Sequence, residues 1–226
     1  MKSWMKLLLG AWISAVLILG VTVPIGDIPG LGDRARIIFF HVPMSWVAVL
    51  AFLMSMWYGI MYLRKRDLKY DIRSESAAEL GFVFCILATV TGSIWARFNW
   101  GSFWNWDPRE TSIFVLLLIY GAYFSLRSAL EIEERRASLS AVYSIIAFVT
   151  VPFFIFIMPR ITFSLHPGGA GSAAPILNTN GKMYMGTDMK YVFFASLIGF
   201  TGLYLWLLQL RTRIGLVSYH KHAEAA

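Results

Sequence analysis

The sequence contains few charged residues and almost no cysteine. Of its 226 residues, 15% are charged, against about 25% in a typical soluble domain. Its single cysteine cannot form an internal disulfide or a cysteine-cluster metal site. Hydrophobic residues make up 58% of the chain, more than one soluble core of this size can bury. These values exclude a disulfide scaffold, a disordered chain and an ordinary soluble enzyme. They indicate a polytopic membrane protein.

Six apolar runs reach or approach the roughly 20 residues that a membrane-spanning helix needs. We expect an all-α protein with six transmembrane helices, forming a single integral-membrane domain over residues 1–226. The spans are predicted at 7–23, 42–63, 80–96, 111–126, 139–158 and 191–210. The fourth run is short, so its helix should extend into the flanking residues. The first run is too long for a signal peptide and is followed by no small-x-small cleavage site, so we expect a retained helix.

The basic residues predict how the spans are oriented. The net charge is +7, and with the N-terminus inside, 13 of the 20 lysines and arginines fall in cytoplasmic segments. This distribution follows the positive-inside rule and predicts that both termini are cytoplasmic. In a membrane protein such a basic excess marks inner loops, so we expect membrane lipid around the chain and no nucleic acid.

One predicted outer segment, residues 95–111, is unusually aromatic. Trp95, Trp100, Trp104 and Trp106 are four of the nine tryptophans of the chain. An aromatic belt at the membrane boundary remains one explanation, but a belt needs only one or two tryptophans per helix end. Asparagine, glycine and serine interleave with the rings and break the hydropathy of a span. We therefore expect a tryptophan-rich outer loop or surface helix that presents a flat platform to a large planar ligand.

The same segment ends in a helix-start pattern. Asp107 is a good N-cap, Pro108 suits the first helical position, and Glu110 completes a capping box. Arg109 is less easily explained, because the helix dipole disfavours a cation at this end. An anionic partner would offset that cost, and the candidates are ligand carboxylates, Asp107 and lipid phosphate.

Two of the four histidines are predicted on the outer side, close to the membrane plane. His41 stands at the start of the second span and His166 in the last outer loop. Taken singly, such a histidine is most often a cap or a hydrogen-bonding residue. Together, beside an aromatic platform, the pair are candidate axial ligands of an iron, which neutral imidazole binds.

A porphyrin would use all of these features. Its flat apolar ring stacks on tryptophan, and its iron accepts histidine from both faces. Its propionates would attract Arg109, Arg97 or Arg160. We therefore expect a haem-binding site that contains His41 and His166.

At these residues the chain resembles a known family. The run from Trp100 to Asp107, WGSFWNWD, is similar to the tryptophan-rich WWD signature of the haem-handling proteins of c-type cytochrome maturation. The six spans, with His41 in FHVP and His166 in LHP, most resemble the CcmC branch. The resemblance covers nearly the whole chain.

The resemblance implies both a function and roles for individual residues. CcmC-type proteins hold haem b at the outer, periplasmic face of the cell inner membrane and pass it to the haem chaperone CcmE. They work beside the transporter subunits CcmA and CcmB and the small CcmD. By motif position, His41 and His166 correspond to the axial iron ligands. The platform residues are Trp100, Trp104, Trp106 and Asp107. The chain shows no catalytic motif, so a delivery component is expected and not an enzyme.

The run DPRET at 107–111 departs from this pattern and is closer to CcsA, the haem-binding half of another maturation system. CcsA-type proteins are expected to have more spans and histidines inside the membrane. None of the four histidines falls within a predicted span here, which favours CcmC over a CcsA-type synthase subunit.

Two other classes of function stay open. A haem permease would place polar or charged residues inside the membrane, and the predicted spans contain few. A structural subunit would use the tryptophan segment only to dock a partner. For haem handover, glycines at 168–171 would let His166 leave the iron.

Overall fold

The computed structural model describes residues 1–25, 31–166 and 185–225, and these residues contain helices and no strand. In chain order the elements are α1 (Ser3–Thr22), η1 (Gly32–Phe39), α2 (His41–Lys65), α3 (Leu68–Trp100), α4 (Pro108–Ser128), α5 (Glu133–Pro152), η2 (Phe153–Ile157), α6 (Met158–Ile161) and α7 (Thr187–Ala225). The η1 segment is a 3-10 helix, and η2 is a π-helix that follows Pro152 directly. A proline removes a backbone donor, so this is where an α-helical ladder is expected to change register.

Six helices of the described chain are long and apolar enough to cross a membrane, as predicted. The short fourth run extends at both ends, because α4 covers Pro108–Ser128. The third and sixth helices are much longer than their predicted spans, with 33 residues in α3 and 39 in α7. At 1.5 Å per residue they measure about 50 and 58 Å, beyond the ~30 Å hydrocarbon core. Hydropathy identified only the parts of these helices that match the membrane.

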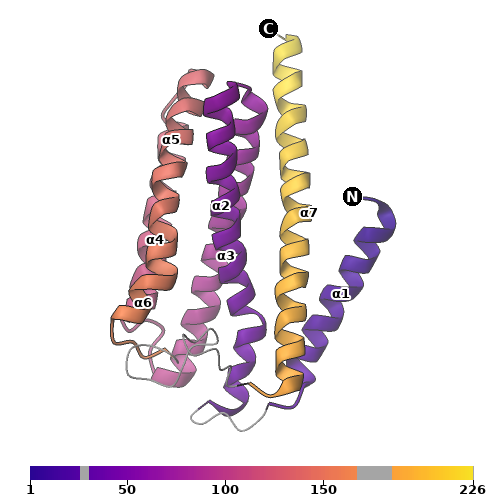
Figure 1. Cartoon of the computed structure of the whole chain (residues 1–226), viewed down its shortest axis with the longest axis vertical. Coiled ribbons are helices and arrows are strands. Elements are labelled where there is room, and N and C mark those ends of the chain that lie inside the picture. Colours follow the sequence, from indigo (N-terminus) through magenta and orange to yellow (C-terminus); the bar gives the residue numbers. More distant parts are fainter. Residues whose placement is uncertain (26–30, 167–184, 226) are drawn as a thin grey trace.

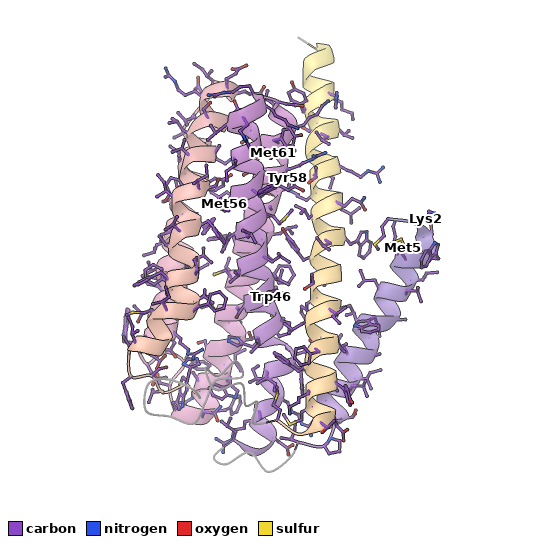
Figure 2. All side chains as sticks on the ribbon, in the orientation of Figure 1. Lys2, Met5, Trp46, Met56, Tyr58 and Met61 are labelled. Atoms are coloured by element: carbon purple, nitrogen blue, oxygen red, sulfur yellow. The ribbon has the colours of Figure 1, made fainter. Side chains whose placement is uncertain are left out.

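The helices form an elongated bundle around α2 (Figure 1). α2 packs along α3 and α5 and also contacts α7, whereas α1 contacts α7 and η1 alone among the described elements. Trp46 lies on the side of α2 that faces α7 (Figure 2), and its indole N–H donates to Thr201 Oγ1 at 3.3 Å. The starts of α2, α4 and α7 and the end of α3 gather at one end of the bundle, which we call the site end.

Small residues bring the central helices close together. A Cβ on Gly59 of α2 would lie 2.6 Å from Ser144 Oγ and 3.3 Å from the Cα of Ala141, both on α5. A Cβ on Gly81 of α3 would lie 2.6 Å from the Phe52 ring on α2. Close approach through small residues is the usual way in which membrane helices gain packing energy. This packing fixes the positions of α2, which begins at His41, and of α3, which carries Trp95 and Trp100.

The opposite end of the bundle carries buried charge. Arg127, 5% exposed, donates to both carboxylate oxygens of Asp71 at 2.7 and 2.9 Å and lies 3.0 Å from Glu75. Arg211 of α7 donates to Glu79 at 2.8 Å. Because Asp71, Glu75 and Glu79 all lie on α3, these ion pairs join α3 to α4 and to α7.

Candidate functional site

The tryptophan segment divides into a helical and an irregular part. Trp95 and Trp100 lie in the last turns of α3, which ends at Gly101. Gly101 has a φ of +80°, a left-handed conformation that glycine adopts at little cost. Residues 101–107 are irregular and lead into α4. The prediction of a loop or surface helix therefore fits residues 101–107, whereas Trp95 and Trp100 continue a bundle helix because no helix-ending residue precedes Gly101.

The aromatic rings form two clusters and not one flat shelf. Trp95 and Trp100 meet edge to face, with ring centroids 5.1 Å apart and planes at 85°. Trp104 and Trp106 meet at 5.8 Å and 89°, and both lie near Phe114 of α4. Edge-to-face pairs are a favoured arrangement of aromatic rings. Trp106 is 69% exposed and has a φ of +56°, so its ring remains available to a ligand or partner.

The helix start at Asp107 has the predicted capping box. The Asp107 carboxylate accepts the Arg109 N–H at 2.9 Å, and Pro108 occupies the first turn. The Glu110 carboxylate accepts from the backbone N–H groups of Asp107 at 3.2 Å and Asn105 at 2.7 Å. These bonds connect the irregular segment to the first turn of α4.

Asp107 has a second role that the capping pattern did not predict. Its carboxylate also accepts from the Ser164 hydroxyl at 2.9 Å, the Leu165 N–H at 2.6 Å and Nδ1 of His166 at 3.0 Å. Burial alone would raise the pKa of the Asp107 carboxyl. The hydrogen bonds from His166 and from the N–H groups of Arg109 and Leu165 outweigh burial and lower this pKa to about 2. The ionised carboxylate therefore holds the segment 164–166 against the start of α4.

His41 is held by α3. It is the first residue of α2, and its Nδ1 lies 3.1 Å from Thr91 Oγ1. Its ring rests on Gly92, where an added Cβ would lie 2.8 Å from Cε1. Neither Thr91 nor Gly92 could be assigned to the site from the sequence, because neither belongs to a recognisable motif.

The 3-10 helix η1 braces the end of α3. The Trp95 indole N–H donates to the Arg34 carbonyl at 2.9 Å, and the Arg34 guanidinium donates to the Phe98 carbonyl at 3.1 Å. Sequence analysis assigned no role to Arg34. Its two bonds fix the helical turn that carries Trp95.

These elements bring several of the candidate residues together at the site end. His166 and Arg109 lie near enough to His41 to act on it electrostatically. The His166 ring lies 4.8 Å from the Trp100 ring and 6.2 Å from the Trp95 ring. Trp104 and Trp106 belong to the separate cluster around Phe114. His41, His166, the Trp95–Trp100 pair and Arg109 therefore lie at the same end of the bundle.

The whole chain matches one protein family. The profile of the family described as "CcmC: Heme exporter protein C" matches residues 1–226. The chain belongs to the CcmC family. It is 32% identical over 182 residues to "Heme exporter protein C" of Paracoccus denitrificans (strain Pd 1222), covering 80% of this chain and 73% of that protein.

Two further relatives extend the comparison beyond bacterial CcmC. A "Putative cytochrome c biosynthesis ccmC-like mitochondrial protein" of Marchantia polymorpha is 30% identical over 125 residues, covering 55% of this chain and 52% of that protein. "Cytochrome c biogenesis protein CcsA" of Cuscuta reflexa is 27% identical over 117 residues, covering 51% of this chain and 37% of that protein. The CcmC membership and these relatives support a role in haem handling for cytochrome c maturation. With six apolar helices, the chain is a multi-pass membrane protein, and its family fits the bacterial inner membrane.

The glycines at 168–171, which were predicted to let His166 leave the iron, lie outside the described residues.

Proposed function

We propose that the chain binds haem b between His41 and His166 and delivers it to the haem chaperone CcmE. The observation that carries the proposal is the convergence of His41 from α2 and His166 from the segment after α6, beside the Trp95–Trp100 pair and Arg109. Bound haem would supply an iron with two axial positions for imidazole. His41 and His166 would fill those positions, Trp100 would contact the ring, and Arg109 would face a propionate.

The residues present fit such a group. Each histidine has an acceptor or hydroxyl at its Nδ1, which is the arrangement found around metal-ligating imidazoles. His166 is 21% exposed, so one side of the site is open to a partner. Asp107 would orient His166 and support the ring wall. Trp104 and Trp106, around Phe114, would extend the platform toward that open side.

The charge distribution supports an outer-face site. Arg64, Lys65, Arg127 and Arg211 belong to the end of the bundle opposite the site end. The positive-inside rule assigns that end to the cytoplasm, so the termini would be cytoplasmic and the haem site periplasmic. There the site could meet CcmE, with CcmA, CcmB and CcmD as neighbours in the membrane. In this proposal the chain acts in delivery and not as an enzyme.

Absorption spectroscopy of the purified protein tests the ligand assignment. We expect bis-histidine bands in the wild type, and their loss or replacement by a single-histidine spectrum in His41→Ala and in His166→Ala. His220→Ala, at the far end of α7, is the matched control and should leave the spectrum unchanged. Unchanged bis-histidine bands in His166→Ala would rule that residue out as a ligand.

A transfer assay tests delivery separately. The haem-loaded protein in detergent is mixed with apo-CcmE, the two are separated, and haem is measured on each. We expect haem to move to CcmE, and to move more slowly to vesicles that lack it. Equal transfer to both acceptors would favour a permease or passive release.

A further inference from the structure

Two hydrogen-bond acceptors at the site face equivalent atoms of the two histidines. Thr91 Oγ1 lies 3.1 Å from Nδ1 of His41, and Asp107 Oδ1 lies 3.0 Å from Nδ1 of His166. A neutral imidazole carries its proton on one ring nitrogen and its lone pair on the other, and the hydrogen-bond partner decides which. The identity of each partner therefore fixes the form of each ring.

Thr91 is an acceptor toward His41. Its hydroxyl donates back along α3, to the Leu87 carbonyl at 2.8 Å or the Ala88 carbonyl at 3.1 Å. Because a hydroxyl has one proton, the remaining lone pairs of Oγ1 face His41.

Asp107 is an acceptor toward His166. A carboxylate has no proton to donate, and this one also accepts from Ser164, Leu165 and Arg109. Nδ1 of His166 must therefore carry the proton in their hydrogen bond. The two partners differ in charge, because one is a neutral hydroxyl and the other an anion.

We infer that Thr91 and Asp107 are positioning residues that hold His41 and His166 in the Nδ1–H form, so that Nε2 of each ring presents its lone pair to a ligand. The claim about the ring protons stands on the hydrogen bonds alone, whereas its use in binding iron rests on the proposed function. A carboxylate partner makes an imidazole a stronger electron donor than a hydroxyl partner does. His166 is therefore the stronger of the two ligands.

Nitrogen NMR of the haem-free protein, labelled in its histidine rings, measures the tautomers directly. We expect both His41 and His166 to show Nδ1–H and an unprotonated Nε2 at a pH where the rings are neutral. Thr91→Val removes the acceptor without changing the size of the side chain and should shift His41 alone. Thr91→Ser keeps the hydroxyl and should restore the wild-type signal. An Nε2–H form of either ring in the wild type would overturn the inference.

Asp107→Asn is the corresponding variant for His166. Oδ1 of Asp107 accepts both the Arg109 N–H and Nδ1 of His166. An amide NH₂ at that position would face Nδ1 and force the proton to Nε2 while losing the Arg109 bond, whereas an amide oxygen there would keep both bonds and the Nδ1–H form. Ser164→Ala, which removes a different bond to Asp107, is the structural control and should leave the His166 tautomer unchanged. A His166 ring that keeps Nδ1–H in Asp107→Asn while the backbone amide signal of Arg109 shows the loss of its bond would contradict the assignment.

Haem measurements then test the role in ligation. Removing the partner of a ligating histidine typically weakens metal binding by about 10–100-fold, so haem should dissociate faster by that factor from Thr91→Val and Asp107→Asn. Asp107→Asn should also raise the midpoint potential of the bound haem more than Thr91→Val does. Tautomers that shift without any change in haem dissociation would overturn the positioning role. Expected tautomers in a protein that binds no haem would instead refute the proposed function and leave the tautomer assignment standing.

Discussion

Adding one methyl group at Gly92 should weaken haem binding while the protein stays folded. In Gly92→Ala the new Cβ would lie 2.8 Å from Cε1 of His41. Two carbon atoms are in ordinary contact at about 3.5 Å, so the ring must move by roughly 0.7 Å. Its Nδ1 would be displaced from Thr91 Oγ1, and Nε2 would be displaced from the position that it offers to an iron.

Gly92→Ala should affect both protein stability and haem affinity. Replacing glycine by alanine inside a helix stabilises the helix by up to about 1 kcal/mol, and an overpacked contact costs about 1–3 kcal/mol. The net change in stability should therefore be a loss of about 0–2 kcal/mol, so the Tm of the detergent-solubilised protein should fall by up to about 8 °C. Haem affinity should fall by about 10–100-fold, because sub-ångström displacement of a ligand is poorly tolerated.

Haem titration of the purified apo-protein, followed by absorbance, gives the affinity, and thermal unfolding of the same sample gives the Tm. Gly121→Ala on α4 is the matched control, since a Cβ there would meet nothing within 4 Å. It should raise or maintain the Tm and leave the titration unchanged. Wild-type affinity and an unshifted spectrum in Gly92→Ala would show that the position of His41 is not critical for the site.

Three further changes test the packing of the bundle and the aromatic wall. Arg127→Met leaves Asp71 buried without its bidentate partner and should cost about 3–5 kcal/mol, visible as a large loss of Tm that the double change with Asp71→Asn partly restores; a Tm within one degree of wild type would refute this. Gly59→Ala drives a methyl group against the α5 backbone at a cost of about 1–3 kcal/mol, which the gain in helix propensity of up to about 1 kcal/mol offsets only in part; a Tm equal to or above the wild-type value would show that α2 and α5 move apart without cost. Trp100→Leu removes ring contacts worth about 0.5–1.5 kcal/mol each, so haem affinity should drop several-fold, and lipid-facing Trp57→Leu should give no such drop.

Most of the fold could be predicted from the sequence, because a membrane-spanning helix requires a long run of apolar residues that hydropathy detects. Length and hydropathy were sufficient for all six helices, and capping chemistry placed the start of α4 at Pro108. Hydropathy did not find the ends of α3 and α7. Once a helix leaves the hydrocarbon it can continue on propensity alone, and only a residue such as Gly101 stops it.

The candidate site was only partly predictable. His41 and His166 could be selected because both fall on the predicted outer side, and the tryptophans because four of the nine lie within residues 95–106. The hydrogen bond of Asp107 to His166 joins residues 59 positions apart, and the contact of Gly92 with His41 joins two helices. Neither leaves a local pattern, because each depends on how the chain packs in three dimensions. The flat platform expected from ring count was likewise replaced by angled pairs, since ring orientation is set by packing.

The Asp107 carboxylate binds both the start of α4 and His166, so it holds the two together. One side chain caps the start of α4 and also binds Ser164, Leu165 and His166. His166 cannot rotate away from this position without losing its hydrogen bond to the Asp107 carboxylate. To keep that bond network intact, residues 164–166 would have to move together. In the proposed function, His41, whose partner Thr91 is uncharged, would be the weaker of the two iron ligands and the first to release haem to another protein.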